Sequence, residues 1–332
     1  MEAFIKAISY YLPEKVVTNE QLVEEFPEWS VEKIAKKVGI NERHVAAEDE
    51  TAGDMAYKAA EKLIQENGIK RDSIDFVLLC TQSPDYFLPS TSCIIQSRLS
   101  LPTKCGAFDF NLGCSGYEYG LAVAKGLIVS GVAKNILLLT AETYNKHIHP
   151  KDKGNRTIFG DGASASLVST DGFAKIGEFV LGSDGSGYDR LIHKTGAMRH
   201  IQPLNDLHDD ENGNPLSSDY LFMDGKAIFD FTADVVPLMI EETLGKHRLT
   251  MDDVNLFVFH QANKYMINYL RKLISIDKDK FFVFMETVGN TVSSTIPIAL
   301  CEARKNGQLK GNVLLAGFGV GLSYGATILR CE

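Results

Sequence analysis

The segment around Cys114 has the features expected of a nucleophilic cysteine. In Phe108–Gly116 (FDFNLGCSG) an apolar, strand-like run passes into a helix-like run through a glycine that permits a sharp turn. Cys114 is therefore expected at or just before the first helical turn, where unpaired backbone N–H groups and the helix dipole favour a thiolate. Gly113 and Gly116 leave room for a bulky thioester to approach the sulfur. The same pattern fits a buried cysteine in a tight turn, so this segment alone leaves both interpretations open.

A cysteine nucleophile generally works with a histidine that lies nearby in space. His260 ends the buried run Leu256–His260 (LFVFH) and precedes Gln261, Ala262 and Asn263. A polar residue just past the carboxyl end of a strand lies where α/β proteins build their sites, although a hydrogen-bonded core histidine is the alternative. The other seven histidines lie in polar segments and are expected to be solvated: His44, His147, His149, His193, His200, His208 and His247.

Two further segments carry candidate polar groups. Val288–Thr291 (VGNT) predicts a turn before a helix over Thr291–Ala303, and Asn290 is there either a helix cap or a fixed amide donor. The glycine-rich segment Gly317–Gly325 (GFGVGLSYG) precedes Ala326–Glu332, which is typical of a terminal strand. Dinucleotide loops and hydrolase elbows both need a following helix, so neither fits. The remaining interpretation is a glycine turn that brings backbone N–H groups against an oxyanion.

The elements around these segments alternate between helices and strands. Apolar residues at helical spacing predict a helix over Thr51–Asn67, and another helix-like run covers Ser115–Val129. Ile74–Cys80 and Asn135–Thr140 are short apolar runs of the buried-strand type. A short surface helix is predicted at Trp29–Lys37. This alternation indicates an α/β fold with buried sheets.

The second half of the chain repeats the first. Asp72–Cys80 (DSIDFVLLC) matches Asp252–His260 (DDVNLFVFH) at an offset of 180 residues, and Lys134–Leu138 (KNILL) matches Gly311–Leu315 (GNVLL) at an offset of 177. Two matches at nearly one offset suggest an ancient duplication. The predicted halves are residues 1–170 and 171–332.

Composition limits the class of partner. Lys and Arg number 34 against 43 Asp and Glu, and the formal net charge of −9 argues against nucleic acid or an anionic membrane as the main partner. The N-terminus lacks the features of a signal peptide, and no apolar run approaches the roughly 20 residues that span a bilayer, so we expect a cytoplasmic protein. The six cysteines are scattered and the His147–His149 pair lacks a third ligand, so no disulfide framework or metal site is expected. The polar segment His200–Asp219 is expected to be an exposed loop.

The order of several motifs resembles one known family along essentially the whole chain. Besides the Cys114 turn and the glycine loop, these motifs are Phe159–Ala163 (FGDGA), Met223–Gly225 (MDG), His260–Asn263 (HQAN) and Gly289–Thr291 (GNT). Together they resemble β-ketoacyl-acyl-carrier-protein synthase III, a member of the thiolase superfamily. The resemblance implies the duplicated, five-layered αβαβα thiolase fold and a homodimer.

The resemblance also implies a mechanism. Cys114 would receive an acyl group from an acyl-CoA primer, while His260 and Asn290 would bind the thioester carbonyl of malonyl-acyl carrier protein and stabilise the enolate left by decarboxylation. That carbanion would attack the acyl-cysteine and release a 3-oxoacyl product. Backbone N–H groups of Cys114 and Val320 would form the oxyanion hole. No metal or redox cofactor would be needed.

Further substrate contacts follow from the same resemblance. Asn263 matches a residue that contacts the pantetheine arm, and Leu88 lies where the partner subunit shapes the acyl pocket. Trp29 and Gly319 complete the expected substrate-binding set. The expected patch for an acidic carrier protein is Lys264, Arg271 and Lys272. Three alternatives stay open: an acyltransferase of this fold that does not decarboxylate, a condensing enzyme of a specialised secondary-metabolite pathway, and a non-catalytic protein that binds a carrier protein.

Overall fold

Two sets of five strands, each in the same spatial order, form the centre of the molecule. The computed structural model describes every residue of the 332-residue chain except Asn212. Within the described residues one continuous ten-stranded sheet runs in the order β14-β13-β15-β16-β8-β1-β7-β6-β4-β5. The first set is β1 (Phe4–Tyr11), β4 (Phe76–Cys80), β5 (Gly106–Phe110), β6 (Asn135–Glu142) and β7 (Gly162–Ser169). The second set is β8 (Ala174–Ser183), β13 (Val254–Phe259), β14 (Phe281–Phe282), β15 (Gly311–Gly319) and β16 (Ser323–Cys331).

The two sets correspond strand for strand. The order β5-β4-β6-β7-β1 repeats as β14-β13-β15-β16-β8, with parallel pairing in the first three strands and antiparallel pairing in the rest. The sets join where Phe4 and Ile5 of β1 pair with Lys175 and Ala174 of β8. A gene duplication produces this kind of repeated order. We therefore propose the division into residues 1–170 and 171–332, at the turn between β7 and β8.

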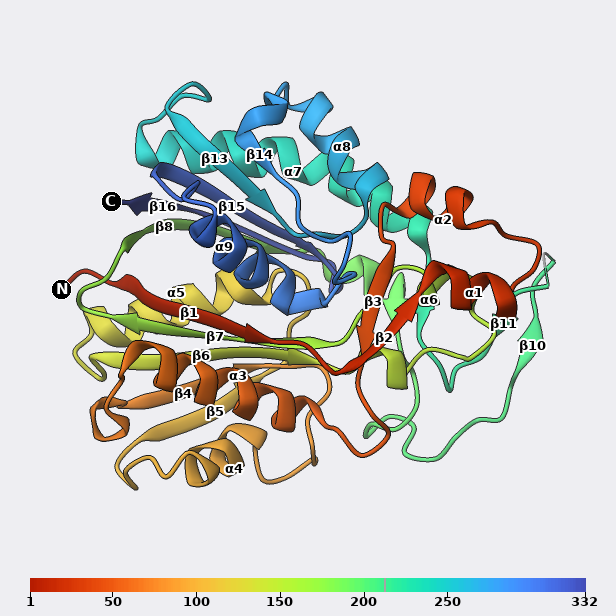
Figure 1. Cartoon of the computed structure of the whole chain (residues 1–332), viewed down its shortest axis with the longest axis horizontal. Helices are drawn as coiled ribbons and strands as arrows, with labels where there is room; N and C mark the ends of the chain where they lie inside the picture. Colours follow the sequence, from red (N-terminus) through yellow and green to blue (C-terminus); the bar gives the residue numbers. More distant parts are fainter. Residues whose placement is uncertain (212) are drawn as a thin grey trace.

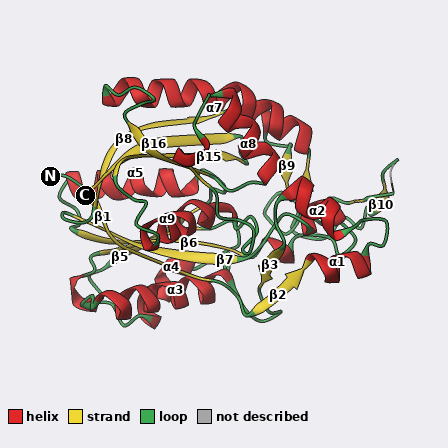
Figure 2. Ribbon diagram, turned by 45° about the horizontal axis from the view of Figure 1, so that its top comes forward, coloured by secondary structure: helices red, strands yellow, loops and turns green. Residues whose placement is uncertain are grey.

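The helices form three layers around the two sets of strands (Figure 1). Between the sets lie α5 (Gly116–Val129) and α9 (Thr295–Lys305), which contact strands of both sets. One outer layer holds α3 (Ala52–Asn67) and α4 (Thr91–Arg98), and the other holds α7 (Gly225–His247) and α8 (Lys264–Leu273). Figure 2 shows the same succession of layers from a second direction. The predicted five-layered αβαβα fold is confirmed.

The sequence patterns explain where most of these elements begin and end. Helix α3 starts at a reciprocal capping box in which Asp54 N–H donates to Thr51 Oγ1 and Thr51 N–H donates to the Asp54 carboxylate. It ends at Gly68, which adopts the left-handed conformation. The strands predicted at Ile74–Cys80 and Asn135–Thr140 are β4 and β6, and the helix predicted at Ser115–Val129 is α5.

Two predicted helices begin later than expected. The helix predicted from Thr291 starts as a 3-10 turn at Val292–Ser294 and becomes α9 only at Thr295, because Val292 has a left-handed backbone with φ of 55°. The surface helix predicted from Trp29 is α2 (Val31–Val38), which starts after the capping residue Ser30. Trp29 therefore precedes the helix.

The remaining elements lie beside the layered core (Figure 1). They are β2 (Lys15–Thr18), α1 (Asn19–Glu25), α2, β3 (Glu42–Val45), α6 (Lys153–Arg156), β9 (Leu191–Ile192), β10 (His208–Asp209), β11 (Pro215–Leu216) and β12 (Phe222–Met223).

The predicted loop His200–Asp219 lies in this part of the molecule. It is exposed through Asp209, but Asn214–Asp219 are half-buried, and Asn212 lies outside the described residues. The short strands β10 and β11 pair with each other here. Of the helices in the described residues, none has the length and apolar character needed to cross a membrane.

Candidate active site

Cys114 lies at the junction predicted from its sequence. Strand β5 ends at Phe110, Ser115 precedes the first residue of α5, and Cys114 is only 7% exposed. The hairpin of β15 and β16 closes over this junction, and the Ser115 and Ser323 hydroxyls lie 2.7 Å apart. At Gly319 a Cβ atom would lie 2.7 Å from the Cys114 sulfur. Glycine at 319 is therefore required for the close approach of this strand to the nucleophile.

The environment of the Cys114 sulfur contains opposing influences. Burial raises the pKa of the thiol to about 12, and the buried carboxyls of Glu142 and Glu118 act in the same direction. The backbone N–H groups of Val320 and of Cys114 itself oppose this rise and lower the pKa. Burial outweighs these donors, so the resting side chain is a thiol and not the thiolate that its position before a helix suggested. The same two N–H groups are those expected to form the oxyanion hole.

His260 follows β13 and is almost completely buried. Its backbone N–H donates to Ala316 O over 2.8 Å, which ties it to β15. Its Nδ1 lies 2.7 Å from Thr295 Oγ1 at the start of α9, and the edge of its ring meets Phe318, with the ring centroids 5.9 Å apart. Burial lowers the pKa of His260 to about 3, so the imidazole is neutral across the physiological range.

Asn290 is held in one orientation by its neighbours. Its Oδ1 accepts a hydrogen bond of 2.9 Å from Val292 N–H, which identifies the other amide atom as the donor Nδ2. Nδ2 donates to Ala262 O over 3.3 Å, close to His260 in sequence. An amide nitrogen carries two hydrogens, so the second can be offered to a ligand.

Val292 connects the two polar side chains. A β-branched residue rarely adopts a positive φ, and its φ of 55° here marks local strain of the kind found at functional sites. In this conformation its N–H holds Asn290, and its carbonyl accepts the backbone N–H of Thr295 and lies 3.0 Å from the Thr295 hydroxyl. Thr295 in turn contacts His260. The strained residue therefore fixes the orientation of both Asn290 and His260.

The turn before Cys114 brings the predicted segments together. A Cβ atom at Gly113 would collide with the Val320 side chain from the glycine loop and would lie 3.3 Å from Val292. The buried carboxyl group of Glu142 accepts hydrogen bonds from Gln82 N–H at 3.0 Å and from the Ser293 hydroxyl at 3.4 Å. This one carboxyl group therefore connects the loop after β4, the end of β6 and the turn before α9. The turn before Cys114 thus contacts the glycine loop and the segment after Asn290, and His260 joins these segments through Phe318 and Thr295.

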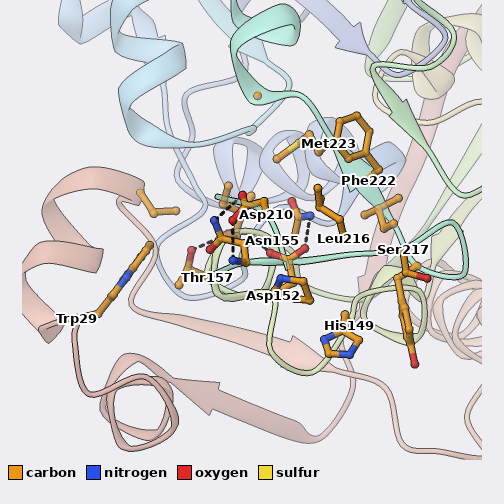
Figure 3. Close-up of a pocket in the computed structure, with 18 of the residues that line it drawn as sticks. Trp29, His149, Asp152, Asn155, Thr157, Asp210, Leu216, Ser217, Phe222 and Met223 are labelled. Atoms are coloured by element: carbon orange, nitrogen blue, oxygen red, sulfur yellow. Dashed lines mark hydrogen bonds between the residues drawn. The ribbon is translucent and has the colours of Figure 1, made fainter. Parts of the chain in front are cut away.

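A pocket with a volume of about 410 Å³ lies between the end of α2, the α6 region and residues 214–225 (Figure 3). Trp29, predicted to bind substrate, lies on one side of the pocket, and Leu216 and Met223 lie on another. The lining includes Ile158, whose carbonyl accepts a 2.9 Å hydrogen bond from Asn290 N–H. The pocket therefore reaches the segment that carries Asn290.

The two other predicted substrate residues have different surroundings from each other. Asn263 accepts a 2.9 Å hydrogen bond from Met266 N–H and caps α8, although its half-buried position next to Ala262 keeps it near the site. Leu88 is 82% exposed in the loop between β4 and α4, beside the exposed Tyr86 and Phe87.

The predicted carrier patch on α8 is partly available. Lys264 and Lys272 are exposed, but Arg271 is half-buried and donates to Ile276 O over 2.8 Å. The Lys264 side chain packs against Gly39 at the end of α2, next to Lys37, which lines the pocket. Exposed cations from two helices therefore lie near the pocket opening.

The prediction that seven histidines are solvated is wrong for His147, His193 and His247. His247 is half-buried, its Nε2 accepts a 2.9 Å hydrogen bond from Glu178 N–H, and its Nδ1 donates to Thr243 O over 2.8 Å. The Nδ1 atoms of His147 and His193 lie 3.0 Å apart, so one ring donates to the other. Burial lowers the pKa of His147 to about 4 and also lowers that of His193. His149 instead meets the Tyr220 ring edge-on, so the two histidines of the H-x-H pair have different neighbours.

Sequence reasoning missed the residues that support the site. Thr295, Val292 and Phe318 contact the predicted catalytic side chains, and Glu142 braces the segments that carry them. Thr295 had a weak signal, because it lies on the first turn of the helix after Asn290. That signal does not distinguish it from the neighbouring serines. The roles of the other three depend on backbone conformation and on contacts distant in sequence.

Comparisons with known proteins agree with this geometry. The sequence model of 3-oxoacyl-[acyl-carrier-protein (ACP)] synthase III matches residues 108–185, and the model of its C-terminal part matches residues 244–331. The beta-ketoacyl-[acyl-carrier-protein] synthase III of Clostridium perfringens is 38% identical over 325 residues, which are 96% of each chain.

Two solved structures extend the comparison to the fold. A 3-oxoacyl-(acyl-carrier-protein) synthase III crystal structure is 46% identical, with a TM-score of 0.97 over 99% of this chain and 100% of that chain. The beta-ketoacyl-[acyl carrier protein] synthase III of Thermus thermophilus is 35% identical, with a TM-score of 0.88 over 99% of both chains. The chain therefore belongs to the 3-oxoacyl-(acyl-carrier-protein) synthase III family of condensing enzymes.

Proposed function

We propose that this protein catalyses the decarboxylative condensation of an acyl group with malonyl-acyl carrier protein to give 3-oxoacyl-acyl carrier protein, in fatty-acid or related biosynthesis. The observation that supports the proposal is that the glycine loop links the Cys114 turn to two oriented polar side chains. Gly319 approaches the Cys114 sulfur, Phe318 contacts His260, and Val292, which holds Asn290, faces the turn at Gly113. Simple acyl transfer needs a nucleophile and an oxyanion hole. A pair of additional donors suits a reaction that also develops an enolate.

In the first half-reaction Cys114 takes the acyl group from acyl-CoA. The sulfur attacks the thioester carbonyl, and the backbone N–H groups of Cys114 and Val320, which already act on the thiol, stabilise the oxyanion. The bond to the CoA sulfur then breaks. The proton of the Cys114 thiol ends on the departing CoA thiol, so the step is balanced.

In the second half-reaction the malonyl thioester replaces CoA. N–H groups of His260 and Asn290 donate to the thioester oxygen, loss of carbon dioxide leaves an enolate on that oxygen, and its carbon attacks the acyl-cysteine. The new carbon–carbon bond replaces the bond between the acyl carbon and the Cys114 sulfur, and the thiolate that leaves takes a proton from water to restore the thiol. A neutral His260 suits this role, because it offers one N–H without adding a buried charge.

The surroundings support the remaining parts of the proposal. The pocket at Trp29 would hold the pantetheine arm, and Lys264 and Lys272 would attract an acidic carrier protein. The exposed Tyr86, Phe87 and Leu88 would pack against a second copy of the chain, and sedimentation would measure the dimer. We expect this reaction in the cytoplasm and without a metal or redox cofactor.

Separating the two half-reactions tests the proposal. His260→Ala and Asn290→Ala should still form an acyl adduct on Cys114, measured by intact-mass spectrometry, but should lose carbon dioxide release from malonyl-acyl carrier protein by about 100-fold or more. His208→Ala, in the exposed segment, is the matched control and should behave like the wild type.

Two results would contradict the proposal. Full decarboxylation by His260→Ala would remove the role given to the histidine. Acyl transfer by the wild-type protein to another acceptor, without release of carbon dioxide, would favour the non-decarboxylating alternative.

A further inference from the structure

The Thr295 hydroxyl lies between two groups that can accept its proton. Oγ1 is 2.7 Å from His260 Nδ1 and 3.0 Å from the Val292 carbonyl oxygen. Thr295 is 3% exposed and His260 is 2% exposed, so bulk water does not provide an alternative partner. A hydroxyl carries a single proton, which it can donate in only one of these directions at a time.

The direction of that proton decides which nitrogen of His260 carries hydrogen. With a pKa of about 3, the buried ring is neutral and holds one proton. If Thr295 donates to Val292 O, Nδ1 must be the protonated nitrogen and Nε2 is left with a lone pair. If Thr295 donates to Nδ1, the ring proton lies on Nε2. Only the second tautomer can donate a hydrogen bond to a thioester oxygen.

Two observations favour donation to His260. The Val292 carbonyl already accepts the backbone N–H of Thr295, so it stays hydrogen-bonded when the hydroxyl points elsewhere. The Thr295 hydroxyl also lies nearer to His260 Nδ1, at 2.7 Å, than to the Val292 carbonyl oxygen, at 3.0 Å. We therefore propose that Thr295 is a positioning residue that donates to His260 Nδ1 and so keeps the ring proton on Nε2, facing the thioester.

This inference rests on the proposed function and assigns it a residue that neither the sequence motifs nor the comparisons assign. It explains why a hydroxylated residue stands at the first position of α9, where its hydroxyl faces the carboxyl end of β13 instead of capping the helix. It also gives the strained Val292 a second structural role, in addition to holding Asn290. The left-handed conformation aligns the Val292 carbonyl with the Thr295 backbone N–H and frees the side chain for His260.

The test compares Thr295→Val, which keeps the shape but removes the hydroxyl, with Thr295→Ser, which keeps the hydroxyl. The matched control is Thr243→Val, because Thr243 is fully buried in the outer helix α7 and its hydroxyl donates to the Met239 carbonyl, at 2.7 Å. Carbon dioxide release from malonyl-acyl carrier protein and acylation of Cys114 are measured separately. Nitrogen NMR of the protein with ¹⁵N-labelled histidine reports the tautomer, and the signal missing from His260→Ala identifies His260.

We expect Thr295→Val to lower kcat for carbon dioxide release by roughly 10- to 100-fold, while acylation of Cys114 persists. Loss of a residue that orients a metal-bound histidine has an effect of this size. Thr295→Ser and Thr243→Val should keep most of the activity. The wild-type spectrum should show His260 with its proton on Nε2. That spectrum does not depend on Thr295→Val and decides the matter even if this variant fails to fold.

An Nδ1-protonated His260 in the wild type, or normal decarboxylation by a folded Thr295→Val protein, overturns the inference. These outcomes differ from a failure of the proposed function. If His260→Ala loses decarboxylation and Thr295→Val does not, only the role of Thr295 is wrong. If His260→Ala itself decarboxylates normally, the proposed function is wrong.

Discussion

At the scale of single residues, the site depends on side chains whose hydrogen bonds leave one direction open. Asn290 is oriented by Val292 N–H, and His260 is oriented by Thr295. The catalytic candidates were predictable from sequence because each follows a recognisable strand end or turn. Val292 and Thr295 were not, because no sequence rule predicts a left-handed valine, and the contact with His260 spans 35 residues.

The close approach of Gly319 to the nucleophile gives a prediction at this scale. In Gly319→Ala the new methyl group would lie 2.7 Å from the Cys114 sulfur and 2.9 Å from its Cβ, which is too close for a folded site to accept unchanged. We expect acylation of Cys114 by acyl-CoA to fall below detection in intact-mass spectra. Gly126→Ala is the control, because Gly126 lies in α5 with open space around it. It should keep acylation and gain about 0.5–1 kcal/mol of stability. Wild-type acylation in Gly319→Ala would show that the strand moves away easily.

At the scale of elements, the buried carboxyl group of Glu142 connects three parts of the fold. Glu142 at the end of β6 accepts hydrogen bonds from the loop after β4 and from the 3-10 turn before α9. The strand itself was predicted from its apolar run. Its last residue was not, because a charged residue at a buried strand end is explained only by partners distant in sequence. The start of α9 was misplaced for a similar reason, the backbone of Val292.

Glu142 should make stability depend on pH in a defined direction. Burial raises its pKa to about 8 in the folded protein, against the ordinary value of 4.5. The folded state therefore binds the proton more tightly than the unfolded state, and stability is lost as pH rises from about 4.5 to about 8. Glu142→Gln carries no titrating group, so its free energy of unfolding should fall less, by on the order of 1–3 kcal/mol, between pH 5 and pH 8.

Urea unfolding at pH 5 and pH 8 measures this difference. The exposed Glu241→Gln on α7 is the control and should keep the wild-type pH dependence. Burial raises the pKa of Asp161 to about 6, so part of the pH dependence of stability should remain in Glu142→Gln and in Glu241→Gln. An equal loss of stability in the wild type and in Glu142→Gln would show that Glu142 is not protonated in the folded protein.

At the scale of the whole molecule, the duplicated fold places the site between the halves. Cys114 comes from the first set of strands and its helix, whereas His260 and Asn290 come from the second. Two short sequence matches were enough to predict the repeat, because buried strands keep similar apolar patterns. The half-buried part of the segment 200–219 was not predicted, because its polar composition does not reveal that Asn214, Leu216 and Ser217 line the pocket.

The most direct measurement is the mass of the enzyme after incubation with acyl-CoA and then with malonyl-acyl carrier protein. The wild type should gain one acyl group, located on Cys114 by peptide mapping. It should then lose that group as carbon dioxide and 3-oxoacyl-acyl carrier protein are formed, and Cys114→Ala should do neither. An adduct on another residue, or condensation by Cys114→Ala at the wild-type rate, would contradict the assignment of Cys114 as the acyl-carrying nucleophile.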